Sequence, residues 1–148
     1  MGNTNQNKDM ESETILDNQY ATLWYYPDHK IVHHQFHRFI FLDNLRYVLN
    51  RGLTVLKEHG AQKWLSDDRH HSALIPEDVY WSQKVWFPEA VEAGWKYWAI
   101  VTPETQVAVM NMQAFAQQCA EQGIQVQFFA DPDEAMTWLI AQNEPVTP

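Results

Sequence analysis

The sequence predicts an α/β fold in which helices pack on a mixed, mostly parallel sheet, with the element order ββαβαβαβα. Short runs of β-branched and aromatic residues alternate with longer segments of helical periodicity, a pattern that favours parallel strands joined by helices. The run WAIV, residues 98–101, is apolar at every position, as expected of a strand covered on both faces. The 148 residues suffice for one domain with one hydrophobic core.

An antiparallel hairpin and a helix open the predicted domain. Residues 20–26, YATLWYY, and residues 31–37, IVHHQFH, are strand-like runs, and the turn-forming sequence PDHK separates them. An apolar stripe with three- and four-residue steps then predicts a helix, which Gly60 ends as a left-handed cap. The stripe consists of Leu42, Leu45, Val48, Leu49, Gly52 and Leu56.

The centre of the chain predicts a strand, an acidic and histidine-rich loop, a tryptophan-rich helix and a second strand. The first strand covers residues 62–66. Pro76 and the two acidic residues after it suit the start of a helix. The proline that follows Phe87 cannot donate to the helical hydrogen-bond ladder, so the helix should kink or stop there, restart and end at Gly94. Residues 95–101 form the second strand.

A helix, a strand and a last helix complete the predicted domain. The first helix presents one apolar face and ends at Gly123; that face consists of Ala108, Met112, Phe115 and Cys119. In the strand over residues 124–129, the apolar residues alternate with glutamines, so one face is expected to be less covered. Asp131 and the proline after it are a strong start for the last helix.

The ends of the chain are predicted to lie outside the domain. Residues 1–18 are polar and cannot offset the entropy of ordering, so we expect a disordered tail. The domain then covers residues 19–142, and residues 143–148 form a C-terminal tail.

The charge and the cysteine content narrow the classes of function. The chain has 19 acidic and 10 basic residues, a net charge of −9, and no basic run that could neutralise phosphates. We therefore expect neither nucleic acid nor a membrane as a partner. The single cysteine rules out an internal disulfide and suits a reducing compartment, so the predicted location is the cytoplasm.

Several motifs together resemble the SpoIIAA-like branch of the STAS domains, over roughly residues 20–141. These motifs are KWLSDDR, PEDVYW, the WFP before a glycine-terminated helix, KYWAIV and FFADPDEAMTWL. The resemblance implies one α/β domain and a regulatory role such as that of the anti-sigma-factor antagonists, and the related CRAL-TRIO fold binds lipids. The antagonists carry a phosphorylatable serine in a glycine-containing turn after the third strand. Here that region reads DDRHHSALIP, so Ser72 matches only by its neighbourhood.

The loop after the first central strand is one candidate site, because ligands of open parallel sheets meet the carboxyl ends of the strands. Its candidates are Asp67, Asp68, Arg69, His70, His71 and Ser72. The carboxylates and imidazoles could ligate a divalent metal and support a metal-assisted hydrolase. Adjacent residues of an extended segment point in opposite directions, however, so only half of the cluster can converge. The alternative is a solvated loop in which the carboxylates cap backbone groups or pair with the arginine.

Catalysis is the less favoured hypothesis. The serines and histidines of this loop lack the strained turn of a nucleophile elbow. We therefore predict no catalytic residue, no metal and no cofactor. In the second strand of the hairpin, His33, Gln35 and His37 share one face, while His34 and Phe36 share the other. This ladder could titrate near neutral pH and switch an interface, or could simply be a set of partly exposed strand positions.

The tryptophan-rich helix carries more apolar surface than one sheet contact needs. Its second face, with Trp81, Val85, Trp86 and Phe87, admits three interpretations: a self-association surface, the wall of an apolar ligand cleft, or a surface covered by the rest of the chain. The sequence best fits a non-catalytic regulatory module that binds a protein partner or forms a homodimer. The alternative is a carrier of an apolar or lipid-like small molecule in a tryptophan-lined cleft.

Overall fold

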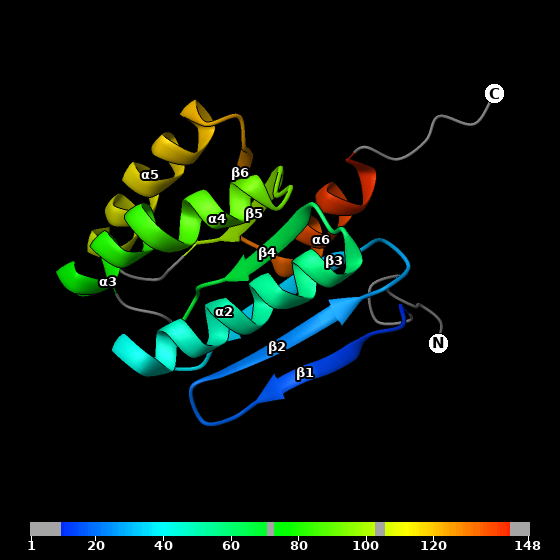
Figure 1. The fold of residues 1–148 in the computed structure, drawn as a ribbon, viewed down its shortest axis with the longest axis horizontal. Helices are drawn as coiled ribbons and strands as arrows, with labels where there is room; N and C mark the ends of the chain where they lie inside the picture. The colour runs from blue at the N-terminus through cyan, green and yellow to red at the C-terminus, as the bar shows by residue number, and fades with distance from the viewer. Residues whose placement is uncertain (1–9, 71–72, 103–105, 143–148) are drawn as a thin grey trace.

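The computed structural model describes residues 10–70, 73–102 and 106–142, which form one six-stranded sheet with helices on both faces (Figure 1). The predictions for His71, Ser72, residues 1–9 and the C-terminal tail over residues 143–148 lie outside these residues. The strands are β1 (Glu13–Asp17), β2 (Ala21–Tyr26), β3 (Ile31–Phe36), β4 (Lys63–Asp67), β5 (Tyr97–Val101) and β6 (Gln125–Phe129). The helices are α2 (Leu42–His59), α3 (Pro76–Trp81), the π-helical turn η1 (Ser82–Trp86), α4 (Phe87–Glu92), α5 (Gln106–Glu121) and α6 (Pro132–Ala141).

The strands lie in the sheet in their order along the chain. β1, β2 and β3 pair antiparallel, whereas β3, β4, β5 and β6 pair parallel. The predicted mixed, mostly parallel α/β fold is therefore confirmed. In the parallel part, His34, Ser66 and Ile100 stand side by side on neighbouring strands. This register brings polar residues that are far apart in the sequence next to each other.

The prediction of a disordered tail over residues 1–18 is wrong for β1, which adds a sixth strand to the predicted five. Ile15 and Leu16 pack against the core, and the Arg51 guanidinium donates a hydrogen bond of 3.1 Å to the Ile15 carbonyl. Contacts with α2 and β2 therefore stabilise β1, and the number of apolar residues in its own sequence does not predict such contacts.

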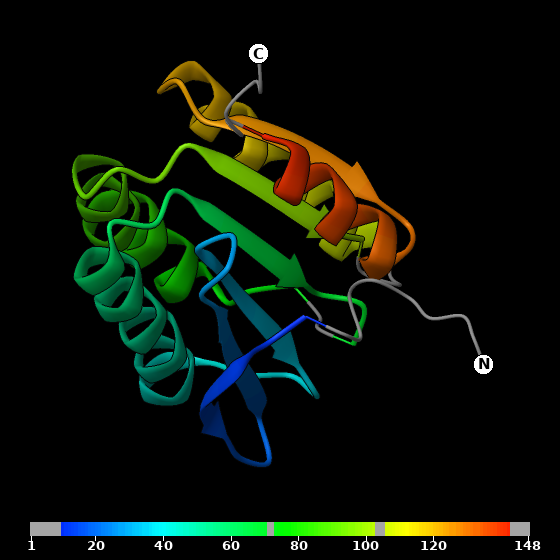
Figure 2. The same ribbon diagram turned by 90° about the vertical axis from the view of Figure 1, so that its right-hand side faces the viewer.

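The helices are divided unequally between the two faces of the sheet (Figure 2). α2, η1, α4 and α5 cover one face, over the larger part of the core, and α6 covers the other face. Strand alternation decides the side: Trp64 and Trp98 face the first layer, whereas Leu65 and Ala99 face α6. Within the described ranges, none of these helices combines the length and apolar character needed to span a membrane.

The predicted interruption near Phe87 takes the form of the π-helical turn η1. The Phe87 amide donates to the Ser82 carbonyl, five residues back, instead of to the carbonyl four residues back. Pro88 has no amide hydrogen and its ring would collide with the carbonyl of the preceding turn, so a regular α-helix cannot pass through this point. π-Helical turns of this kind are frequent at functional sites.

Gly52 of α2 allows that helix to lie directly on a tryptophan of the sheet. A Cβ atom at residue 52 would stand 2.3 Å from Cη2 of Trp64, far inside van der Waals contact. The Trp64 side chain is fully buried. Gly52 therefore serves the packing of the helix, since it lies in the interior of α2 and not at a cap.

We predict that Gly52→Ala destabilises the protein although alanine is the better helix former. The added methyl group must displace the indole or the helix, and overpacking of this kind costs about 1–3 kcal/mol. Urea unfolding measures the change. Asn50→Ala, at an exposed position of the same helix, is the control and should be neutral. Equal stability of the Gly52→Ala variant and the wild type would contradict the close packing.

His33 lies on the α6 face of β3 and is not placed to act as a switch near neutral pH. Its ring contacts those of Trp24 and Tyr26, and its Nδ1 is 3.0 Å from the Tyr26 hydroxyl. The pKa of His33 is lowered to about 3, mainly by burial and in part by the nearby imidazole of His34, and the Asp67 carboxylate opposes the shift only in part. Of the two alternatives for the histidine ladder, the switch near pH 7 therefore does not fit His33.

This lowered pKa predicts a loss of stability in weak acid. Between pH 6.5 and 3 the unfolded chain binds a proton at residue 33 and the folded chain does not. The free energy of unfolding should therefore fall by about 1–2 kcal/mol from pH 7 to pH 5, since the limiting slope is about 1.4 kcal/mol per pH unit. His33→Gln should reduce this loss of unfolding free energy. Urea titrations at each pH measure it. His70→Gln, at an exposed position, should leave it as in the wild type.

Candidate functional site

A cavity lies on the helix-covered face of the sheet, beneath η1 and between α2 and α5. Its volume is about 60 Å³, well above the roughly 10–15 Å³ that one water molecule needs. Four tryptophans contribute to its walls: Trp64, Trp86, Trp95 and Trp98. The other apolar lining residues are Phe36, Leu45, Leu49, Leu74, Met112 and Phe115, and the polar ones are His34, Ser66, Asp68 and Ser82. The cavity is thus mostly apolar, with a few polar groups, as small-molecule sites are.

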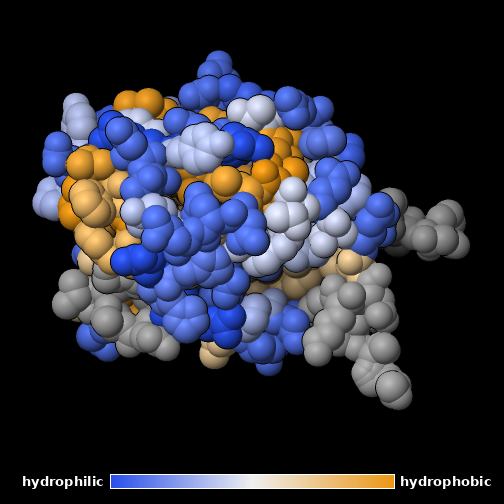
Figure 3. All heavy atoms as spheres, turned by 90° about the horizontal axis from the view of Figure 1, so that it is seen from below, coloured by the Kyte–Doolittle hydropathy of each residue, from blue (hydrophilic) through white to orange (hydrophobic). Residues whose placement is uncertain are grey.

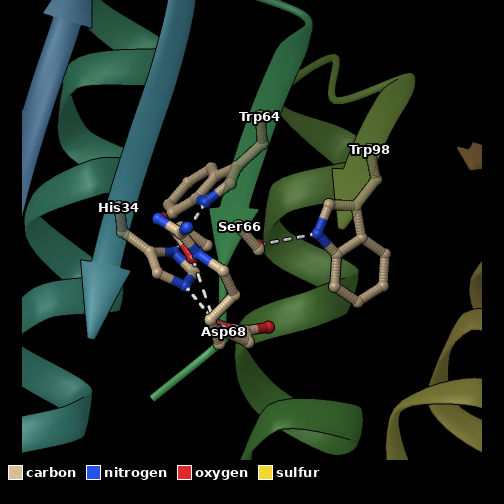
Figure 4. Close-up of polar contacts among 7 residues, drawn as sticks. His34, Trp64, Ser66, Asp68 and Trp98 are labelled. Atoms are coloured by element: carbon tan, nitrogen blue, oxygen red, sulfur yellow. Dashed lines mark hydrogen bonds and ion pairs between the residues drawn. The ribbon is translucent and has the colours of Figure 1, made fainter. Parts of the chain in front are cut away.

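Three of the lining residues form a hydrogen-bonded chain along one wall (Figure 4). The Trp64 indole Nε1 donates to Nδ1 of His34 at 2.9 Å, and Nε2 of His34 lies 3.0 Å from Oδ1 of Asp68. An indole N–H can only donate, so Nδ1 of His34 is the acceptor and carries no hydrogen. The hydrogen of the neutral ring therefore sits on Nε2 and is donated to the carboxylate.

This arrangement leaves His34 without a free lone pair. Its Nδ1 accepts from the indole and its Nε2 donates to Asp68. A general base needs an available nitrogen within hydrogen-bond reach of the proton that it removes. His34 instead positions the Asp68 carboxylate, which is buried at 1% exposure.

Two serines complete the polar part of the cavity. Ser66 of β4 accepts a hydrogen bond of 2.8 Å from the Trp98 indole, and both side chains are drawn in Figure 4. Ser82, the first residue of η1, is 2% exposed, and its hydroxyl has no hydrogen-bond partner within the described part of the chain. The π-helical turn therefore holds an unpaired hydroxyl at the cavity wall.

The tryptophans present carbon surface and no hydrogen-bond donors to the cavity. Besides Trp64 and Trp98, the Trp86 indole donates to the Leu49 carbonyl at 3.0 Å and the Trp95 indole to the Tyr97 carbonyl at 3.2 Å. All four N–H groups are thus used within the protein. The rings also pack on one another in a chain, with centroid distances of 5.3, 5.4 and 5.2 Å for the pairs Trp64–Trp86, Trp86–Trp95 and Trp95–Trp98. These contacts fix the shape of the walls.

The two aspartates of the predicted loop point to opposite faces of the sheet. Asp67 lies on the α6 side, where Nε and Nη2 of Arg69 donate to its two carboxylate oxygens at 2.9 and 2.7 Å. Burial raises the pKa of Asp67, but the hydrogen bonds and charge of Arg69 outweigh it and hold that pKa below its usual value. Asp68 lies at the cavity. Within the described part of the loop, the two aspartates therefore do not converge on one point.

The described part of the loop does not form a metal site. His70 is exposed, and within residues 10–70, 73–102 and 106–142 no three histidine, cysteine, aspartate or glutamate side chains gather as metal ligands would. Asp67 and Asp68 have different partners, Arg69 and His34. Their chemistry is that of an ion pair on one face and a buried hydrogen bond on the other.

Only part of the predicted apolar surface of the tryptophan-rich helix is exposed to solvent. Trp86 and Phe87 are buried, at 5% and 6% exposure, so neither lies on an exposed self-association surface. Trp86 faces the cavity. Trp81 is partly buried, with the Arg46 guanidinium 5.2 Å from its ring centroid, and Val85 remains exposed. The surplus apolar area is thus taken up mainly by the cavity and the core.

Most of the cavity residues were not singled out from the sequence. Trp64 and Trp98 stand in register on neighbouring parallel strands, and the alternation of β4 and β5 already places both on one face. This signal was available once the two strands were aligned. No such signal exists for Ser82, because no sequence pattern predicts that a serine in a helix has a buried, unpaired hydroxyl.

Comparison with known proteins identifies the fold. No protein-family model matches the chain, and no curated protein matches it. A crystal structure of an uncharacterised protein of the DUF3478 family, from Shewanella loihica PV-4, has a SpoIIAA-like fold and is similar to this chain. The TM-score is 0.54, with 13% sequence identity, over 88% of this chain and 93% of that one. The chain therefore has a SpoIIAA-like fold, as the sequence motifs implied.

Proposed function

We propose that the protein is a non-catalytic binding module that holds a small, largely apolar molecule in the tryptophan-lined cavity. The observation that carries this proposal is the unpaired hydroxyl of Ser82 at the wall of a mostly apolar cavity. A buried hydroxyl without a partner costs about 1–3 kcal/mol. A bound molecule with one hydrogen-bonding group would remove that cost.

The rigidity of the walls supports a preformed site. Each indole N–H of the cavity has a partner in the protein, and neighbouring rings pack at centroid distances of 5.2–5.4 Å. Rings held in this way cannot collapse into the space without losing hydrogen bonds. A preformed apolar cavity binds with little loss of conformational entropy.

The size of the cavity favours a compact ligand. A volume of about 60 Å³ is several times what one water needs, roughly 10–15 Å³, but gives no room for a long acyl chain. The lipid-carrier hypothesis is therefore narrowed to a small apolar or aromatic molecule. A non-catalytic role fits the hydrogen bonds of His34, which leave its imidazole no nitrogen for general base catalysis.

We predict that Ser82→Leu abolishes ligand binding and keeps the protein folded. The larger apolar side chain fills part of the cavity and removes the unpaired hydroxyl. Native mass spectrometry of freshly purified protein should show an added mass in the wild type and none in the variant. Ser82→Ala is the matched control, because it removes the hydroxyl but leaves the space.

The control separates the two parts of this proposal. Ser82→Ala should bind more weakly than the wild type and unfold at the same or a higher temperature, since no hydrogen bond is lost. If wild-type protein carries no added mass, and no member of a small-molecule collection raises its unfolding temperature, the binding function is refuted.

A second candidate function is self-association, and the exposed aromatic residues near the start of α2 favour it. Phe39 and Phe41 stack at 5.2 Å and are both more than 40% exposed. Tyr80 and Val85 are also exposed, and the Leu42 amide donates to Asp78 at 2.8 Å, which joins the two segments. Figure 3 shows a cluster of apolar atoms at the left end of the molecule, where α2 begins.

For this second function we predict that Val85→Glu weakens a dimer. A charge placed in an apolar contact loses hydration without gaining a partner, which costs several kcal/mol. Sedimentation velocity over a range of concentrations gives the dissociation constant. Met110→Glu, a similar change at an exposed position of α5, is the control and should have no effect. Wild-type protein that stays monomeric at all concentrations would rule self-association out.

A further inference from the structure

The Asp68 carboxylate is a buried acid whose only recorded side-chain partner, among the described residues, is a neutral imidazole. It is 1% exposed, and His34 donates to one of its oxygens at 3.0 Å. The nearest arginine along the chain, Arg69, is engaged with both oxygens of Asp67. A buried carboxylate normally has a cation as partner, because the loss of hydration is otherwise not offset.

The cavity around this carboxylate is built from aromatic rings. Trp64, Trp86, Trp95 and Trp98 line it together with Phe36 and Phe115. Because the indole N–H groups donate to His34, Leu49, Tyr97 and Ser66, the rings turn no positive hydrogen-bonding group to the ligand. The face of an aromatic ring carries negative charge density and attracts cations, most strongly in tryptophan.

We propose that the ligand of the cavity is a small organic ammonium ion, held by the Asp68 carboxylate as counter-ion and by the surrounding indole rings. This inference rests on the binding function proposed above and names the chemical class of its ligand. The Ser82 hydroxyl, which has no partner in the described part of the chain, accepts a hydrogen bond from an N–H or O–H of the ligand. The net charge of −9 favours the approach of cations over anions.

The same walls discriminate against other cations. A divalent metal needs several oxygen or nitrogen ligands, and here one carboxylate stands among apolar rings, with no cluster of three ligand side chains within the described residues. An alkyl- or arylammonium ion, by contrast, places its carbon atoms against the rings and its charge near Asp68. Removing water from such an ammonium ion costs less free energy than removing water from a divalent metal ion, which suits a site with few polar groups.

The test compares ammonium ions with neutral molecules of nearly the same shape. Isothermal titration calorimetry measures three pairs with wild-type protein: butylammonium and 1-butanol, benzylammonium and benzyl alcohol, and choline and 3,3-dimethyl-1-butanol. In at least one pair the cation should bind about tenfold more tightly or better, since a desolvated cation–π contact alone contributes on that scale.

Asp68→Asn identifies the counter-ion. Asparagine keeps the shape and can still accept the hydrogen bond from His34, but it has no charge. The cation should bind this variant about tenfold more weakly, and the neutral partner of the pair as before. Asp67→Asn is the matched control: it removes the same charge from the neighbouring residue, which lies on the other face of the sheet, and should leave the preference for the cation intact.

The outcomes separate this inference from the binding function. If cation and neutral molecule bind equally well, and Asp68→Asn changes neither, the cavity binds small molecules but is not a cation site. If Asp67→Asn lowers the preference as much as Asp68→Asn does, the effect is one of overall charge and the assignment of Asp68 is wrong. If no member of any pair binds at millimolar concentration, the ammonium inference is overturned, and the added mass in native spectra decides the binding function separately.

Discussion

The packing of Trp64 against Gly52 is the contact on which the helical side of the molecule depends. A side chain at residue 52 would stand 2.3 Å from the indole, so α2 can lie on the sheet at this depth only with glycine there. The same indole donates to His34 and meets Trp86 edge-on at a centroid distance of 5.3 Å. One side chain thus sets the spacing of the layers, orients the polar wall and supports the aromatic wall.

The cavity follows from large, rigid rings and an irregular helix. Four indoles held by hydrogen bonds cannot interdigitate as completely as aliphatic side chains, which adapt their rotamers to fill space. The π-helical turn before Pro88 adds a residue to one turn and places Ser82 and Trp86 together at the cavity. The other polar residues of the wall, His34, Ser66 and Asp68, come from β3, β4 and the segment after it, which the parallel register brings side by side.

The sequence predicted those parts of the fold that local patterns determine. Gly60 ends α2 in the left-handed conformation as expected. Asp67, the last residue of β4, and Asp68, directly after it, point to opposite faces of the sheet, as expected of adjacent residues in an extended segment. β1 was missed because its order comes from Arg51 and β2. The direction of Trp86 stayed open for a related reason: an apolar stripe shows that a face will be covered, but not whether a neighbouring helix or a second copy covers it.

The Ser82 hydroxyl and the Asp68 carboxylate lower the folding stability, whereas the apolar residues of the core raise it. A leucine in place of Ser82 and a neutral residue in place of Asp68 would each relieve a buried group that lacks full compensation. Folding alone therefore gives no reason for these two residues to lie at one cavity. Local conflicts of this kind are expected at functional sites, where the missing partner is supplied by a ligand. A carboxylate with a neutral neighbour, an unpaired hydroxyl and a ring of indoles together fit a ligand that carries a positive charge and little else that is polar.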